Sequence, residues 1–337
     1  MKTRMMLAGV MLVAGATAAE AQCPTAAADA CRKATDLLSF MTPQLSTALA
    51  GGNPTLGQGG VLGGLGHFSL DIRASAVNGS LPQLNNVDLS TTGARQSTFT
   101  SKNQIIPFPS VDLGVGLWKG LSLGVTHILG VDAIVTATYI PNINTSNGST
   151  GGGSSSGDVA FKVNGSNLQL GYGGRLGWLE EGAFWPGASF VYAQRSLPSM
   201  SVTGNFSPST GSGVTGTMAL NDFTVKTTVW RVSVAKNLLI LNLSAGFGQD
   251  KYDATSSIVA TVTAPAPVGT QTGTASGPLS MTRTNMFVGA ALNLFIFKVE
   301  GEYGQVSGGS VPTLLNNFGS DPNGSRSYFT LGLRFGR

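Results

Sequence analysis

The last strand-forming segment of the chain constrains its fold more than any other feature. Residues 328–335 read Tyr-Phe-Thr-Leu-Gly-Leu-Arg-Phe, so apolar and polar or small side chains alternate almost to the C-terminus. Successive side chains of a strand point to opposite faces of a sheet, and a closing strand of this kind is typical of bacterial outer-membrane β-barrels. We therefore expect one face of the sheet to contact lipid.

The same period of two recurs along residues 67–337, between connections of two kinds. The clearest alternating segments are 68–75, 111–118, 168–175, 239–248 and 295–303. The short connections lie near 119–120, 180–182, 235–237 and 293–294, and the long polar ones are 78–104, 141–157, 206–218, 265–277 and 310–324. Short and long connections alternate, as periplasmic turns and outer loops do in membrane barrels.

This pattern predicts an all-β fold, a transmembrane antiparallel up-and-down β-barrel over residues 67–337, with a short N-terminal helical segment. The count is ten strands. It rises to twelve if the long stretches 121–140 and 238–264 contain further hairpins, because about 9–11 residues of a strand cross a bilayer. A soluble, exported β-sandwich is the alternative fold.

Composition supports the barrel. Charged residues make up only 11% of the chain, against about 25% in soluble domains. A soluble protein with so few charges would tend to aggregate, whereas a barrel with a lipid-facing belt does not need more. The formal net charge of +4 is too small to indicate a nucleic-acid partner.

The N-terminus has the features of a secretory signal peptide. Lys2 and Arg4 precede the apolar run Met5–Val13, and Ala19-Glu20-Ala21 provides a cleavage site. We expect residues 1–21 to be removed and the protein to reach the bacterial outer membrane. Lipidation of Cys23 would need a small residue before it, and Gln22 stands there instead.

Residues 22–66 precede the first strand and differ from the rest of the chain. Residues 26–50 repeat apolar side chains at helical spacing, and Pro43 is expected to kink or break this helix. A Gly-rich passage, 51–66, follows. Two interpretations stay open: the segment plugs or caps the barrel, or it forms an ordered periplasmic tail.

Cys23 and Cys31 are the two cysteines of the chain, and an exported protein allows a disulfide between them. On one continuous helix they would lie about 12 Å apart, too far for a bond. A bridge therefore requires a turn between them, which Pro24 and the Ala-rich stretch permit. Two free thiols are the alternative.

Charged residues on the polar faces of the strands are the best functional candidates. Arg or Lys on the lipid face would cost about 2–4 kcal/mol near the midplane, so these side chains should point into the lumen. They are Asp71, Arg73, Asp112, Arg175, Lys298, Glu300, Glu302 and Arg334. Both signs are present, which suits either a lumen filled by ion pairs or a lining for a solute path.

The tryptophans indicate where the membrane interface lies. Trp118, Trp178, Trp185 and Trp230 are all expected near the short-turn end, and Trp prefers the interface because its ring is partly apolar and partly polar.

No motif indicates catalysis, a metal or a cofactor. His67 and His127 lack an obvious pair of outer acidic partners, and Asp321–Gly324 lacks the later Glu of a calcium loop. The Gly211–Gly216 match to G-x-G-x-x-G has no buried strand before it and no helix after it. We expect no enzyme activity.

The passage from Gly51-Gly52-Asn53-Pro54 to Leu65–Ala76 resembles the N-terminal part of uncharacterised outer-membrane barrels and, more loosely, FadL-type transporters of hydrophobic compounds. Asn53-Pro54 matches the Asn-Pro element of the plug in that family. The resemblance covers about 30 residues of a chain shorter than a fourteen-stranded member of the family. It implies diffusion of small, apolar molecules through a plugged barrel and assigns no binding residues.

These observations predict an outer-membrane channel or transporter for passive passage of small, in part hydrophobic, solutes. The alternative is a structural or surface-interaction barrel with a filled lumen. The expected partners are outer-membrane lipid, the barrel-assembly machinery through the C-terminal strand, and a small solute that the sequence does not identify.

Overall fold

A computed structural model describes residues 22–56, 58–124, 126–140, 143–144, 159–206, 208 and 213–336. The predicted signal peptide, most of the connection 141–157 and part of the Gly211–Gly216 motif lie outside these residues. Among the described residues, no helix combines the length and the apolar character that crossing a membrane requires.

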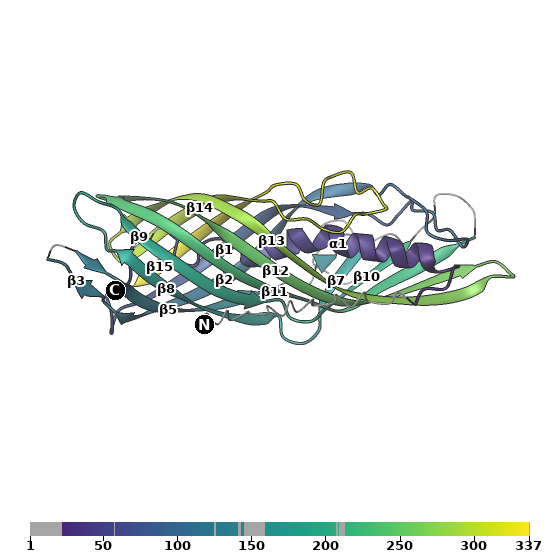
Figure 1. Ribbon diagram of the computed structural model, residues 1–337, viewed down its shortest axis with the longest axis horizontal. Helices are drawn as coiled ribbons and strands as arrows, with labels where there is room; N and C mark the ends of the chain where they lie inside the picture. The colour runs from purple at the N-terminus through teal and green to yellow at the C-terminus, as the bar shows by residue number, and fades with distance from the viewer. Residues whose placement is uncertain are drawn as a thin grey trace, which may run out of the picture.

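Within the described residues, ten strands close a single antiparallel ring (Figure 1). Around the ring they are β1 (Phe68–Pro82), β2 (Ser101–Trp118), β5 (Gly130–Tyr139), β8 (Leu168–Leu179), β9 (Gly187–Ser196), β11 (Thr215–Leu238), β12 (Leu241–Ala264), β13 (Gly269–Leu294), β14 (Phe297–Ser307) and β15 (Arg326–Gly336). The first and last strands pair, with Ser69 opposite Gly336 and Val77 opposite Tyr328. The predicted up-and-down barrel is confirmed, at the lower of the two expected strand numbers.

In the part of the chain that the structure describes, five short strands lie outside the ring. A hairpin of β3 (Leu121–Ser122) and β4 (His127–Ile128) connects β2 to β5. At the other end, β10 (Met200–Phe206) pairs with the distal part of β11, and β7 (Val159–Val163) and β6 (Ile143–Asn144) extend that sheet. The stretch 121–140 therefore does contain an extra hairpin, and His127 lies in it, before the third barrel strand β5.

The expected loop 265–277 is also wrong. β12 and β13 pair in unbroken register from Leu241–Leu292 to Ala264–Gly269, so only residues 265–268 form the turn. The reason is that Thr and Ser occupy the outward positions of residues 269–277, and small residues such as Gly273 occupy inward ones. With no apolar face, the sequence resembles a loop, although Thr favours strands. The expected loop 206–218 likewise gives way at both ends to β10 and β11.

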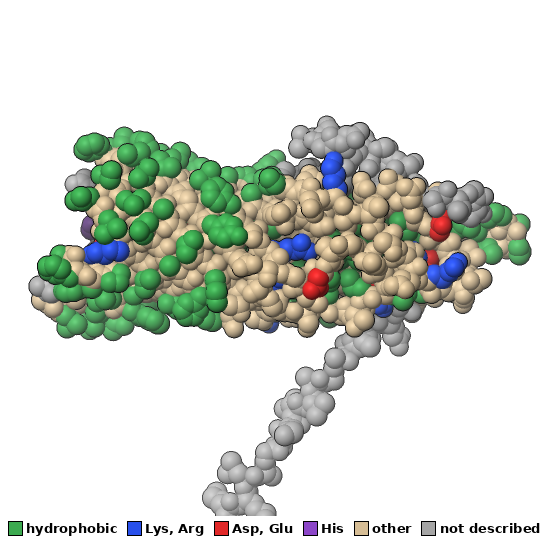
Figure 2. Space-filling model, turned by 90° about the horizontal axis from the view of Figure 1, so that it is seen from above, with side chains coloured by type: hydrophobic (Ala, Val, Ile, Leu, Met, Phe, Trp, Pro, Cys, Tyr) green, Lys and Arg blue, Asp and Glu red, His purple; other side chains and the backbone are tan. Residues whose placement is uncertain are grey.

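The outer surface of the barrel divides into two halves (Figure 2). Toward the short turns, the outward side chains are apolar and exposed, as in the cross-strand pair Phe247 and Met286, which are 51% and 63% exposed. The next outward row is polar and comprises Gln249, Thr284 and Ser307. The apolar half is the lipid-facing belt of a membrane barrel, and the polar half extends beyond it into water.

Helix α1 (Ala28–Ala50) lies inside the barrel, where it contacts β1, β11, β12 and β13 (Figure 1). Its residues are buried on nearly all sides. Pro43 lies within this single helix and neither breaks it nor divides it, which corrects the expectation of a break. The ring of Pro43 removes one backbone hydrogen bond, while the hydroxyls of Thr42 and Thr47 donate to the carbonyls of Leu38 and Pro43.

The chain enters the lumen at the long-loop end. Gln22 exchanges two backbone hydrogen bonds with Thr274, near the β12–β13 turn. Cys23 and Cys31 are joined by a disulfide across the turn that precedes α1. Residues 51–66 then continue to the short-turn end, where the chain enters β1. The segment 22–66 thus runs through the lumen from one mouth to the other.

Candidate functional site: the filled lumen

The outer part of α1 binds two loops through buried carboxylates. Asp29 accepts hydrogen bonds from the backbone N–H groups of Ser90 and Arg95, each at 2.8 Å. Asp36 accepts from the N–H groups of Leu315 and Asn316, each at 2.9 Å. Hydrogen bonds to a charged acceptor are about twice as strong as neutral ones, so the loops 83–100 and 308–325 are fixed to the helix over the outer mouth.

Lys33 lies within the same outer cluster, above the lipid-facing belt. Its ammonium donates to Asp29 at 2.5 Å and to the carbonyl of Arg95 at 3.2 Å, and its side chain is fully buried. Burial lowers the pKa of Lys33, and the hydrogen bond to Asp29 partly opposes this shift. The cluster is therefore a closed, internally paired contact with no free charge offered to a ligand.

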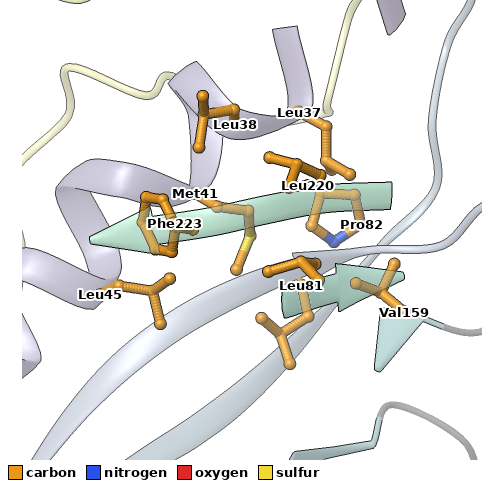
Figure 3. Close-up of a pocket in the computed structure, with 10 residues that line it drawn as sticks. Leu37, Leu38, Met41, Leu45, Leu81, Pro82, Val159, Leu220 and Phe223 are labelled. Atoms are coloured by element: carbon orange, nitrogen blue, oxygen red, sulfur yellow. The ribbon is translucent and has the colours of Figure 1, made fainter. Parts of the chain in front are cut away.

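Below this cluster, α1 packs against the wall through apolar side chains. Leu37, Met41 and Leu45 face Leu220 and Phe223 (Figure 3). The cavity left between them measures only about 10 Å³. Burying one such side chain contributes about 1.5–3 kcal/mol, so this contact is a main source of affinity between the helix and the barrel.

At its C-terminus, α1 meets a positive charge on the wall. The guanidinium of Arg195 in β9 donates to the carbonyl of Ala50 at 2.9 Å and lies 3.4 Å from those of Leu49 and Gly51. It also lies 3.7 Å from the carboxylate of Asp112. A cation satisfies the unpaired carbonyls and the negative end of a helix dipole.

The passage after the helix rests on further buried charges of the wall. Glu302 accepts hydrogen bonds from the N–H of Asn53 at 2.9 Å and from the hydroxyl of Tyr328 at 3.0 Å. Arg175 donates to Asp132 and to the side-chain carbonyl of Gln58, each at 2.5 Å. Charged groups of the membrane-spanning wall thus bind the segment directly, in addition to pairing with one another.

The eight predicted lumen residues all point inward. Arg73 pairs with Asp112, Arg175 with Asp132, and Arg334 with both Asp71 and Glu300. Seven of the eight are buried to 3% exposure or less, as the values for Asp71, Arg73, Asp112, Arg175, Glu300, Glu302 and Arg334 show. Lys298 differs, because it is only partly buried and lines the inner mouth.

Sequence reasoning missed several equally buried charges. Arg231 and Asp250 form an ion pair of 2.8 Å at zero exposure, and Asp132 and Arg195 belong to the networks above. Arg231 lies between apolar and β-branched neighbours in β11, and Asp132 lies in the largely apolar run of β5. Their strands showed no clear polar face, although a single charge inside an apolar strand was itself a usable signal.

The histidines and tryptophans occupy the short-turn end with one exception. His127 Nδ1 lies 2.6 Å from a carboxylate oxygen of Glu180, and His67 precedes β1. Trp118, Trp178 and Trp185 are at or next to the short connections. Trp230 lies eight positions before the end of β11 and next to the outward, polar Thr228, so its expected place at the short-turn end is wrong.

The outer edge of the belt, where Trp230 lies, also carries tyrosines, which the sequence analysis did not identify. The hydroxyl of Tyr172 donates to Gln194, and the Gln194 amide donates to the hydroxyl of Tyr192, both at 2.8 Å. Tyr303 and Ser327 hydroxyls lie 3.0 Å apart. These rings fit the second interface of a membrane barrel, where half-polar aromatics are enriched.

A cavity opens at each mouth of the barrel. The outer cleft, of about 440 Å³, lies between α1 and the β12–β13 wall; Arg32, Leu38, Ile258 and Leu279 contribute to its lining. The inner cavity, of about 250 Å³, lies beside the start of β1. Among the described residues, no group of three or more His, Cys, Asp or Glu is arranged to hold a metal ion.

No protein-family model and no curated protein matches the chain. Among solved structures, outer membrane protease OmpT from Escherichia coli is 12% identical with a TM-score of 0.40, covering 81% of this chain and 97% of that one. An outer-membrane channel from Pseudomonas putida F1 is 9% identical with a TM-score of 0.31, covering 83% and 98%.

The transport unit of the Escherichia coli autotransporter AIDA-I is 8% identical with a TM-score of 0.31, covering 91% and 98%. At sequence identities and TM-scores this low, the likenesses say nothing about what this chain does. The protein's class follows from its own closed ring and apolar belt: it is a ten-stranded transmembrane β-barrel of the outer-membrane type.

Proposed function

We propose that the protein is exported by its signal peptide to the outer membrane and provides a gated passage for small solutes, with residues 22–66 as the movable plug. One observation carries this proposal: the lumen is filled by a separate, non-strand segment. Apart from the isolated bridge between Gln22 and Thr274 at its start, that segment is held by contacts that involve side chains, so it can leave without opening any strand pair of the ring.

The helix itself indicates the width of the passage. An α-helix with its side chains is about 10–12 Å across, so displacement of α1 would leave a lumen of roughly that width. The wall would then expose charges such as Arg195 and Asp112, which a water-filled channel tolerates and an apolar one does not. This supports passage of small solutes.

The outer cleft supports a solute with an apolar part. Ile258 and Leu279 line its wall, and Arg32 and Ser39 contribute polar groups. Leu38 lines both this cleft and the apolar contact below it. A partly hydrophobic molecule bound in the cleft would therefore act directly on the packing that holds α1.

A structural or surface-interaction barrel is the second candidate. It is favoured by the extent of burial: the ion pairs Arg231–Asp250 and Arg73–Asp112 have at most 1% of their side chains exposed. Breaking a buried pair costs about 3–5 kcal/mol. A plug that never moves would have the same contacts. The gated passage and the structural barrel therefore differ in whether the plug moves.

A reversible lock tests whether the plug moves. A Cβ atom at Gly273 would lie 2.7 Å from Cys31 Sγ, so a Cys23→Ser, Gly273→Cys variant should link α1 to β13 by a new disulfide. We expect the transient openings of the wild-type protein in planar bilayers to disappear in the oxidised variant and to return on reduction. Cys23→Ser alone is the matched control.

Equal openings in the locked and reduced forms would contradict a moving plug at this end of the helix. If neither the wild type nor the reduced variant ever opens, the structural candidate gains.

A further inference from the structure

Two positive side chains face each other at the inner mouth. Lys298 in β14 and Arg334 in β15 are direct cross-strand partners, and both line the cavity of about 250 Å³. Like charges placed opposite each other destabilise a sheet. In this barrel the pair is adjacent to an open cavity, which leaves room for a negatively charged group between them.

The hydrogen-bonding capacity of these two groups is only partly used. Arg334 is 3% exposed, and its Nε donates to Asp71 at 2.5 Å. Its Nη1 lies 3.1 Å from Glu300 in an ion pair, but among the described residues no group meets hydrogen-bond geometry with Nη1 or Nη2. Among the described residues, no ion pair and no hydrogen bond involves the ammonium of Lys298.

The lining of the cavity defines its electrostatic character. Asp71 and Glu300 pair with Arg334 but do not line the cavity, whereas Lys298 and Arg334 do. Gln58 adds an amide to the lining, and Phe68 and Phe297 add aromatic rings. The charged groups that a ligand would meet are thus both cationic, beside an apolar surface.

We propose that the inner mouth is a binding site for a phosphate group, held between Lys298 and Arg334. A phosphate monoester carries about −1.5 to −2 charges near neutral pH, which matches two neighbouring cations better than a single carboxylate does. Arg offers the planar fork and Lys the point charge that phosphate sites use. The site is present in the closed barrel and does not depend on movement of the plug.

Two probes separate the sources of such a phosphate. Inorganic phosphate represents a soluble anion, and hexyl phosphate represents an amphiphile whose chain would lie on Phe68 and Phe297. Binding of each to the full refolded chain in a non-ionic detergent is measured by calorimetry. The test variant is Lys298→Gln. The control is Lys119→Gln, which removes an exposed charge from the same end of the barrel, outside the cavity.

We expect hexyl phosphate to bind the wild type and the Lys119→Gln control equally and the Lys298→Gln variant about tenfold more weakly, which corresponds to loss of one hydrogen bond to a charged group. Equal binding of inorganic phosphate would assign the site to a soluble anion, and preference for hexyl phosphate would assign it to an amphiphile such as a lipid headgroup. Failure of both probes to bind, or no effect of Lys298→Gln, would overturn the proposal. None of these outcomes bears on the gating of the lumen.

Discussion

At the scale of single residues, the interior charges of this barrel hold the N-terminal segment in place. Arg195 donates a hydrogen bond to the C-terminal end of α1, and Arg175 donates one to Gln58. Glu302 accepts a hydrogen bond from the N–H of Asn53. Each of these wall residues is buried to 6% exposure or less, and each binds the plug while also pairing with, or lying close to, other charged or polar wall groups. Loss of one such group therefore affects the plug as well as the wall.

Replacement of Arg195 by Ala should show this coupling. The change leaves the carbonyl of Ala50 without its charged donor, while Asp112 keeps its pair with Arg73. We expect a loss of about 1.5–3 kcal/mol, the range for a hydrogen bond that involves a charged group, and more frequent openings in bilayers. Heat-modifiable migration on gels measures the loss of stability. Lys226→Ala, at an exposed outward site, is the control, and equal behaviour of the two variants would contradict the role of Arg195.

At the scale of elements, the outer loops and the helix form one packed unit. Phe318, in the loop between β14 and β15, stacks between Phe40 of α1 and Phe99 of the loop before β2, with ring centroids 4.7 and 4.6 Å apart. Asp29 and Asp36 of the helix bind the same loops. Movement of the helix therefore requires release of these loops.

Phe318→Ala should separate the loops from the helix. Removal of a buried Phe typically costs about 3–5 kcal/mol, and the loss here falls on the contact between loop and helix and not on the ring of strands. We expect faster proteolysis of residues 308–325 in the folded protein, with little change in resistance of the barrel itself. Phe184→Ala, at a side chain that is 91% exposed, is the control. Unchanged cleavage of the loop would show that the ring stack does not hold it.

The elements also show what a sequence of this kind can and cannot predict. Alternation identified the strands with a lipid face, such as 328–335, because lipid requires an apolar face there. It failed for 269–277, where both faces are polar or small and Thr and Ser take the outward positions. The burial of α1 inside the barrel was one of two open interpretations, since a helix with Asp29, Lys33 and Asp36 does not look like a buried one. Only the wall and loop partners of these groups, distant in sequence, explain their burial.

The candidate site was predictable only where its charged residues lie on strands with clear alternation. Arg73, Asp112 and Arg334 stand out on alternating strands, whereas their pairing depends on register across the ring. Arg195 and Arg231 act from strands whose pattern hid them. The contact of Glu302 with Asn53 joins residues 249 positions apart, which no local pattern reveals.

The molecule as a whole consists of a ten-stranded wall that is complete by itself and a 45-residue segment, 22–66, that closes it. The ring closes through β1 and β15 without help from the segment. The wall should therefore fold without α1, and its lumen should then conduct.

Single-channel conductance of the refolded protein in planar bilayers, with and without residues 22–50, tests this claim most directly. Heat-modifiable migration first establishes that both forms are folded barrels. We predict that the full chain is closed with brief openings and that the truncated barrel conducts steadily, because removal of the helix leaves a passage roughly 10 Å wide. A folded truncated barrel that does not conduct would contradict a plugged pore. It would leave a structural or surface-interaction role as the function of the protein.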